Sequence, residues 1–196
     1  MKILLTGCCG FIGFNFVNSL VKTNKKIKIV GIDNLNNYYS VGLKKARLKI
    51  LLKSKNFTFQ KIDLENLKLL NNLFKKNKFD CIFHLAAQAG VRYSIKNPKK
   101  YIDSNIIGFF NIIELARKTN IKKIFYASSS SVYGDSKKFP LNEKTIINPK
   151  NTYGLTKKFN EELAEVYSNY YDINFVGLRF FTVYGEWGRP DMMILK

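Results

Sequence analysis

The chain has 196 residues and a net charge of +19, and its length suits one domain with a full hydrophobic core. No apolar stretch is long enough to span a bilayer, and the opening apolar run stops at Thr6 and Gly7, which argues against a signal peptide. The three cysteines form no disulfide framework, and no His/Cys cluster has the spacing of metal ligands. We therefore expect a reducing, cytoplasmic location and no bound metal.

The positive charge is carried mainly by lysine, since only five of the 33 basic residues are arginine. The lysines occur along every predicted helix and loop, and Asn and Ile are also abundant, which is typical of an AT-rich genome. A solvated lysine surface is the interpretation that we favour. Nucleic-acid binding is the alternative, and a salt-dependent affinity for RNA would support it.

Apolar strands alternate with helical patterns along the chain. Strands are predicted at Lys2–Thr6, Lys28–Ile32, Phe57–Ile62, Cys81–Ala86, Lys123–Ala127 and Asn174–Phe180. Helices are predicted at Phe11–Lys22, Gly42–Lys53, Glu65–Lys76, Pro98–Thr119 and Thr152–Tyr171. The strands show no clean alternation, as expected for a parallel sheet that is buried on both faces. This order predicts an α/β fold, a Rossmann-like doubly wound parallel sheet with strand order 3-2-1-4-5-6.

The end of the chain has the pattern of a second region. Residues 1–180 contain all the predicted strands and form the expected dinucleotide-binding domain. Residues 181–196 are expected to begin a substrate-binding region, and Met193–Leu195 read as the start of an apolar element. We expect the N-terminal part of a longer protein, with the C-terminal substrate domain largely absent.

A glycine-rich segment follows the first predicted strand. Gly7 permits a tight turn, Gly10 lets a ligand approach the backbone, and Gly13 allows close packing of the next helix. The N-terminus of that helix attracts phosphate groups. Asp33, about 20 residues later, suits a ribose diol and would repel a 2′-phosphate, which favours NAD over NADP. By itself the glycine pattern also fits a turn without a ligand.

Tyr153 and Lys157 lie four residues apart at the start of a predicted helix and so share one face. A nearby ammonium lowers the pKa of a phenol, which would make Tyr153 a general base. Ser129 belongs to a serine run, Ser128–Ser131, at the carboxyl end of a predicted strand, where ligands bind in such folds. Taken singly, these patterns also fit a surface pair and a polar turn. Together with the glycine loop, they indicate one crevice.

Several motifs in sequence order resemble the extended short-chain dehydrogenase/reductases, specifically the NAD-dependent nucleotide-sugar epimerases and dehydratases. The resemblance covers essentially the whole chain, and its motifs are Thr6–Gly13, Asp33–Leu35, Asp63–Leu64, His84–Ala87, Ser129–Gly134, Tyr153–Lys157 and Leu178–Thr182. Two further segments, Gln88–Ser94 and Arg179–Asp191, are similar to the UDP-glucuronate 4-epimerase branch.

The resemblance implies a set of NAD contacts. They are Gly7, Gly10, Phe11, Ile12, Gly13, Asp33, Asn34, Asp63, Leu64, Leu85, Ala86, Ala87, Gln88, Asn105 and Phe181. It also implies that Tyr153 takes the proton of the sugar 4-hydroxyl while the 4-hydride passes to NAD and later returns to the other face. Lys157 holds the nicotinamide ribose and keeps Tyr153 acidic, and Ser129 hydrogen-bonds the same oxygen. His84 is expected to pack and hydrogen-bond rather than catalyse.

The substrate is indicated by two serines. Family dehydratases carry an acid pair after the catalytic hydroxyl, where this chain has Ser130 and Ser131, which favours epimerisation. We expect these serines and Thr182 to bind the carboxylate of UDP-glucuronate, which would be interconverted with UDP-galacturonate. Arg189 is interpreted as an anion contact or a structural ion pair, and Arg92 as a substrate contact or a loop anchor.

Other functions stay open at this stage. They are another epimerase, dehydratase or reductase of the family, an RNA-binding or scaffolding protein with an epimerase-like fold, and an inactive fragment. The resemblance also implies a homodimer formed through the predicted helices Pro98–Thr119 and Thr152–Tyr171. An apolar stripe with helical spacing, formed by Phe159, Leu163, Val166 and Tyr170, is consistent with it, although part of the stripe must face the sheet.

Overall fold

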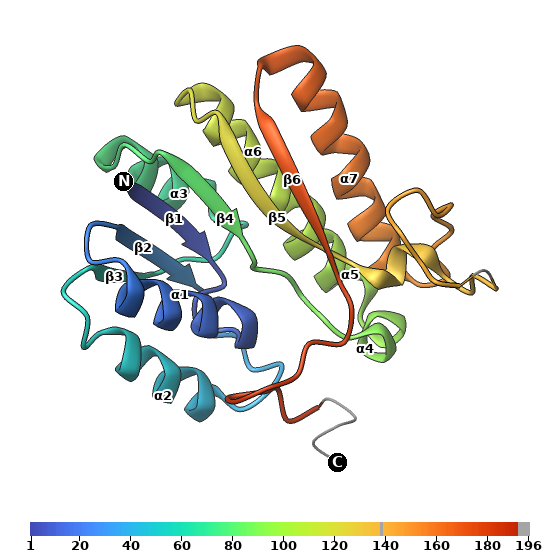
Figure 1. The fold of residues 1–196 in the computed structure, drawn as a ribbon, viewed down its shortest axis with the longest axis horizontal. Coiled ribbons are helices and arrows are strands. Elements are labelled where there is room, and N and C mark those ends of the chain that lie inside the picture. The colour runs from blue at the N-terminus through green and yellow to red at the C-terminus, as the bar shows by residue number, and fades with distance from the viewer. Residues whose placement is uncertain (138, 192–196) are drawn as a thin grey trace.

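The computed structural model describes residues 1–137 and 139–191, so the apolar element expected at 193–195 lies outside the described residues. Six parallel strands form one sheet in the order β3-β2-β1-β4-β5-β6, as predicted (Figure 1). The strands are β1 (Lys2–Thr6), β2 (Lys28–Asp33), β3 (Phe57–Lys61), β4 (Cys81–His84), β5 (Lys123–Ser129) and β6 (Asn174–Phe180).

Helices cover both faces of this sheet (Figure 1). They are α1 (Phe11–Thr23), α2 (Val41–Leu51), α3 (Leu67–Lys76), α4 (Val91–Lys96), α5 (Pro98–Tyr101), α6 (Gly108–Lys118) and α7 (Thr152–Tyr171), with a π-helical turn η1 (Ile102–Ile107) and a 3₁₀ turn η2 (Ser130–Tyr133). Among the residues that the structure describes, no helix combines the length and apolar content needed to cross a membrane.

Two apolar cores lie on opposite faces of the sheet. Because side chains alternate along a strand, Ile3 and Leu5 of β1 join the core beneath α1 and α2, whereas Leu4 joins the core beneath α3, α6 and α7. Both cores are fully packed, which explains why β1 shows no polar alternation. Because all six strands are parallel, their carboxyl ends lie at one edge of the sheet, and the loops that lead to the helices begin there.

The predicted helix Pro98–Thr119 is confirmed as one continuous helical run that ends at Lys118, but it is not a regular α-helix throughout. It is divided into α5, η1 and α6, and the short helix α4 before it was not predicted. Asn105 of η1 is fully buried and bonds the backbone of Gln88, so a tertiary contact accompanies the π-helical turn. The strand predicted at Cys81–Ala86 ends at His84, and β5 runs on to Ser129, so Ser128 and Ser129 lie within the strand.

Candidate active site

A cleft opens at the carboxyl edge of the sheet, where β1 and β4 lead their following helices to opposite faces. This is the switch point at which ligands bind in doubly wound folds. Eighteen of the residues predicted for the site line the cleft: Gly7, Gly10, Phe11, Ile12, Gly13, Asp33, Asn34, Asp63, Leu64, Leu85, Ala86, Ala87, Gln88, Ser129, Tyr153, Lys157, Phe181 and Arg189.

The glycine-rich loop has no room for side chains. Gly7 has φ +74°, in the left-handed region, and a Cβ there would lie 2.7 Å from the backbone nitrogen of Ala86. A Cβ on Gly13 would lie 2.2 Å from the carbonyl oxygen of Gly7. Helix α1 begins directly afterwards with no side-chain cap and no acid in its first turn. Its first N–H groups are thus left for an anion, which fits the pyrophosphate of a dinucleotide.

Asp33, at the end of β2, faces this loop. Its carboxylate oxygens accept the backbone N–H groups of Cys9 at 3.0 Å and of Leu35 at 2.8 Å. Burial raises the pKa of Asp33, while these N–H donors and the ammonium of Lys44 act in the opposite direction. The carboxylate is fixed at the place where the ribose of a dinucleotide would lie.

The predicted catalytic side chains come together from β5 and α7. Asn151 caps α7 by accepting the N–H of Gly154 at 2.8 Å, which places Tyr153 and Lys157 on the first two turns. The ammonium of Lys157 donates to the carbonyl of Ala127 at 2.7 Å and lies 5.9 Å from the centre of the Tyr153 ring. Burial lowers the pKa of Lys157 to about 8.

The pKa of Tyr153 shifts in the direction opposite to the one expected from its spacing to Lys157. Burial raises it, while the Ser129 hydroxyl and the charge of Arg189 lower it in part. The pKa of Tyr153 is therefore raised rather than lowered here, because desolvation is the larger effect, and the role of Lys157 toward the phenol stays a prediction.

An ion pair behind the serine run was not predicted. Arg179, at the carboxyl end of β6, donates to both carboxylate oxygens of Glu161, at 3.0 and 2.8 Å. Glu161 also accepts the hydroxyl proton of Ser128 at 2.5 Å. The contact ties β6 and α7 to the end of β5, beside Ser129. Glu161 follows Lys157 by one helical turn, which is the only sequence signal for its place.

Five predicted site residues do not line the cleft. Asn105 lies behind it, where its amide bonds the backbone of Gln88 and the hydroxyl of Thr156. The other four are Arg92, exposed on α4, Ser130 and Ser131 in η2, and Thr182, exposed after β6. Arg189 does line the cleft, and it binds both carboxylate oxygens of Asp191, at 3.0 and 2.6 Å.

Several lining residues were missed by the sequence analysis. They include Asn36, Tyr38, Tyr39 and Lys44 after β2, Ser104 in η1, and Val183 after β6. Lys44 is buried and donates to the backbone and side-chain oxygens of Asn36 at 2.8 and 2.7 Å. The polar and aromatic run that follows Asp33 was the available signal for this part of the site.

Buried titratable groups next to the site have structural contacts. Burial lowers the pKa of His84 to about 3, so the ring is neutral at pH 7, and its Nδ1 lies 3.0 Å from the Thr6 hydroxyl, which confirms the packing role predicted for it. Among the described residues, Cys8, Cys9 and Asp33 are close enough to share an ion. Burial raises the pKa of the Cys8 thiol well above its usual value, which disfavours the thiolate that would bind a metal. We assign no metal to this group.

A doubly wound sheet with a glycine-lined cleft, an acid after the second strand and a Ser–Tyr–Lys set at the same edge defines a dinucleotide-binding protein of the short-chain dehydrogenase/reductase type. The sequence agrees. The chain belongs to the NAD dependent epimerase/dehydratase family, which it matches over residues 3–196.

Relatives and solved structures agree with this family. The chain is 51% identical to Protein CapI of Staphylococcus aureus, covering 100% of this chain and 58% of that protein. It is 45% identical to UDP-glucuronate 4-epimerase 4 of Arabidopsis thaliana, covering 98% of this chain and 44% of that protein. The structure of UDP-glucuronic acid 4-epimerase from Bacillus cereus, in complex with UDP-glucuronic acid and NAD, matches with a TM-score of 0.90 and 36% identity, covering 100% of this chain and 61% of that one.

A more distant enzyme shares the fold as well. UDP-glucose 4-epimerase from Thermotoga maritima, solved with UDP-glucose, matches with a TM-score of 0.86 and 30% identity, covering 98% of this chain and 59% of that one. The chain thus spans between 44% and 61% of the length of these four proteins.

Proposed function

We propose that this chain acts, as part of its protein, in an NAD-dependent nucleotide-sugar 4-epimerase that interconverts UDP-glucuronate and UDP-galacturonate. The observation that carries the proposal is the gathering of Ser129, Tyr153 and Lys157 at one edge of the glycine-lined cleft. The UDP-glucuronate 4-epimerases of Arabidopsis thaliana and Bacillus cereus, at 45% and 36% identity, support the substrate.

NAD fits the residues of the cleft. Its pyrophosphate would lie on the N-terminus of α1, which has no capping side chain, and its adenosine ribose against Asp33. The Asp33 oxygens keep lone pairs beyond the N–H groups that they accept, so they can also accept ribose hydroxyls. The same negative charge disfavours a 2′-phosphate, which supports NAD over NADP.

When bound, NAD supplies the acceptor and later the donor of the hydride at sugar C4. Tyr153 takes the proton of the 4-hydroxyl and later returns it, and Ser129 donates a hydrogen bond to the same oxygen. Lys157 is held on Ala127, which fixes its ammonium beside the phenol.

Epimerisation is favoured over dehydration by the residues that follow Ser129. An elimination needs a carboxyl group to move protons, and Ser130 and Ser131 offer only hydroxyls. A UDP-glucose 4-epimerase is the second candidate function, because the enzyme from Thermotoga maritima shares this fold at 30% identity. We further propose a cytoplasmic location, supported by three free cysteines.

The test uses the protein expressed from its complete gene. It is incubated with UDP-glucuronate, UDP-glucose and UDP-N-acetylglucosamine, and the epimers are separated. UDP-galacturonate is expected, with no bulk change in NADH absorbance.

Tyr153→Phe should lower turnover by about 10²–10⁴-fold because it removes the general base. The control is Tyr170→Phe on the exposed side of the same helix. Consumption of added NADH, or no epimer from any sugar, would refute the function.

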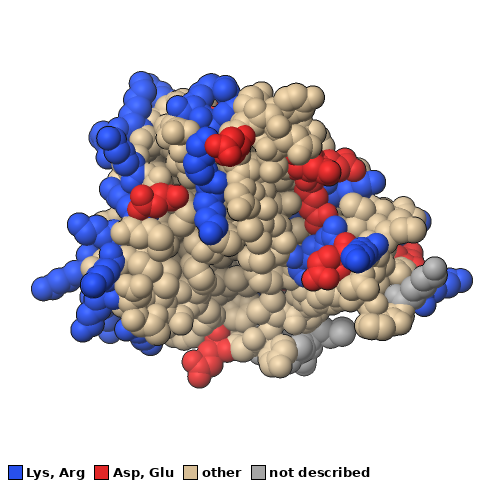
Figure 2. Space-filling model, turned by 45° about the horizontal axis from the view of Figure 1, so that its top comes forward, with Lys and Arg blue, Asp and Glu red and all other residues tan. Residues whose placement is uncertain are grey.

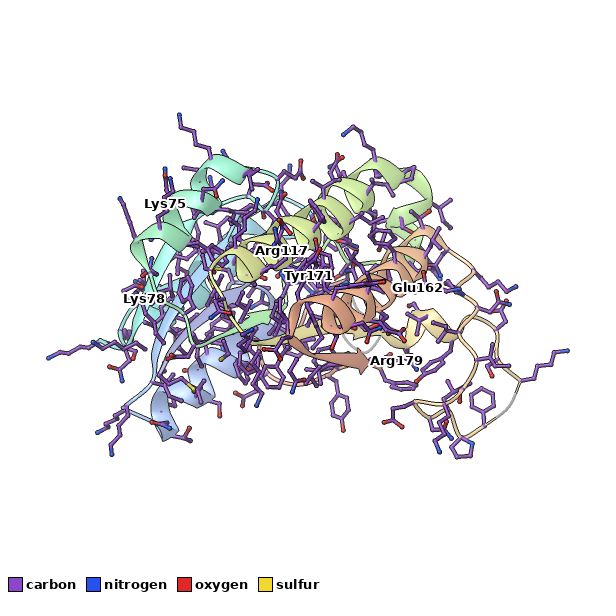
Figure 3. The ribbon with its side chains drawn as sticks, turned by 90° about the horizontal axis from the view of Figure 1, so that it is seen from above. Lys75, Lys78, Arg117, Glu162, Tyr171 and Arg179 are labelled. Atoms are coloured by element: carbon purple, nitrogen blue, oxygen red, sulfur yellow. The ribbon has the colours of Figure 1, made fainter. Side chains whose placement is uncertain are left out.

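We also propose a homodimer. Exposed apolar side chains cover the outer sides of η1, α6 and α7: Ile102, Ile107, Phe110, Leu155, Phe159, Val166 and Tyr170. Leu163 of the predicted stripe packs against the core instead. The α6 and α7 helices lie side by side (Figure 1), and Arg117 lies 5.0 Å from the ring of Tyr171 between their ends (Figure 3). If the α6 and α7 helices of one subunit packed against those of a second subunit, the exposed apolar side chains would be buried in a four-helix bundle.

A further inference from the structure

The residues after β6 cross the cleft rather than leave it. We call residues 183–191 the strap, which runs back over the start of α1 towards α2 (Figure 1). Asn15 of α1 donates to the carbonyl of Glu186 at 3.1 Å, and the ring of Phe14 lies 5.4 Å from that of Trp187. Two strap residues, Val183 and Arg189, line the same cleft as the glycine-rich loop.

One buried side chain joins this strap to the loop. Arg47 of α2 is 0% exposed and is the largest fully buried side chain among the described residues. Its guanidinium donates to the carbonyl of Cys9 in the glycine-rich loop at 3.0 Å. On the strap, it donates to the carbonyls of Trp187 and, at 3.3 Å, Gly188. A single planar group therefore binds both the glycine-rich loop and the strap.

The chemistry of this contact is unusual for a buried cation. Every acceptor of Arg47 is neutral, no ion pair within the described residues includes it, and its Nε has no partner. Burying such a charge is costly, and only the rigid fork of a guanidinium reaches separate carbonyls at once. Cys9 extends the link, because its N–H binds Asp33 while its carbonyl binds Arg47.

The backbone of the strap is strained at Trp187. Trp187 has φ +63°, in the left-handed region that a bulky side chain rarely adopts without surrounding contacts. The carbonyl of this same residue accepts from Arg47. Without that bond, the strained turn loses the contact nearest to it.

We propose that Arg47 is a positioning residue that holds the strap against the glycine-rich loop and so slows the release of the dinucleotide. The inference rests on the proposed function. It predicts that the cofactor stays bound between turnovers, because a dinucleotide between the glycine-rich loop and the strap would leave only when the strap moves.

The experiment compares Arg47→Met and Arg47→Lys in the NAD-loaded protein from the complete gene. We measure the rate of NAD release after dilution and limited chymotrypsin cleavage, for which Tyr184 and Trp187 are sites within the strap. NAD release at least tenfold faster is expected, with the first cuts in the strap. Asn15→Ala, which removes a second strap contact, should act in the same direction. Arg117→Met, on α6, is the matched control.

The outcomes separate the inference from its premise. NAD release at the normal rate in both Arg47 variants overturns the inference, whether or not the strap is cut. Uniform cleavage along the whole chain, with Asn15→Ala behaving as the unaltered protein, also overturns it, because Arg47 would then only support the fold. If the unaltered protein retains no NAD, the proposed function fails instead.

Discussion

The two serines after Ser129 lie beside the site in the turn η2. The hydroxyl oxygen of Ser129 accepts the N–H of Ser131 at 3.1 Å, so the 3₁₀ turn η2 is capped by the hydroxyl for which we propose a catalytic role. Ser130 and Ser131 are half-buried, close behind the cleft. A carboxylate in this turn would repel a uronate, whereas hydroxyl groups can donate hydrogen bonds to it.

Replacing Ser131 with Glu tests this preference. Ser131→Glu should lower kcat/KM for UDP-glucuronate at least tenfold, because it adds a negative charge to η2, next to Ser129, where we propose that the substrate carboxylate binds. Ser131→Gln has nearly the same size without the charge and should retain most of the activity. The measurement is the rate and identity of products after separation. An unchanged kcat/KM with Glu, or an equal loss with Gln, would contradict the carboxylate contact.

The Tyr153 and Lys157 pair shows where residue-scale prediction stops. Their spacing correctly predicts one helix face, since it depends only on helix geometry. The direction of the Tyr153 pKa depends on burial, which is set by the strands and loops that close over α7. Spacing holds no information about that environment, so the sign of the shift was not predictable from the sequence.

At the scale of elements, the packing of α1 on the glycine-rich loop is the contact that shapes the phosphate site. Gly13→Ala places a methyl group 2.2 Å from the Gly7 carbonyl oxygen, so the helix must shift. We expect a loss of about 1–3 kcal/mol in the free energy of unfolding and weaker NAD binding. Urea unfolding and NAD titration measure the two effects.

Gly42→Ala is the matched control, because a methyl group there meets only the Ser40 hydroxyl at 3.5 Å. Since alanine is the better helix former, this variant in α2 should gain up to about 1 kcal/mol and bind NAD normally. If both substitutions changed stability and NAD binding equally, the contact between residue 13 and the Gly7 carbonyl would not be the reason for glycine at this position.

Most elements were predictable because the strands are short apolar runs punctuated by glycine and polar residues. Their order follows from the alternation of strand and helix. Two features were not predictable. The π-helical turn η1 accompanies the bonds of Asn105 to Gln88 and Thr156, and the strap is fixed by Arg47 and Asn15. Both depend on contacts between residues far apart in the sequence, and local sequence patterns hold no information about such contacts.

At the scale of the molecule, the lysines are less evenly spread than the sequence indicates. Where a helix leads to the next strand, the last helical turn and the connection together carry several lysines in four of five cases: Lys22, Lys25 and Lys26; Lys53 and Lys55; Lys75, Lys76 and Lys78; Lys118 and Lys122. The passage from α7 to β6 carries none. They gather at the amino ends of the strands, and Figure 2 shows basic side chains projecting along the rim of this side. Lysines at helix carboxyl ends complement the helix dipole. The cleft lies at the opposite edge, so this charge is separate from the site.

The proposed dimer makes the last prediction at this scale. Val166 is 48% exposed on the outer side of α7, within the apolar surface of η1, α6 and α7. Val166→Glu should yield a monomer by light scattering, because a charge without a partner would be buried between the two helix pairs. Leu52→Glu introduces the same charge at a 54% exposed apolar position after α2, away from this surface, and should stay dimeric. A monomeric mass for the unaltered protein, or a dimer that persists with Glu at 166, would show that these helices do not form the interface.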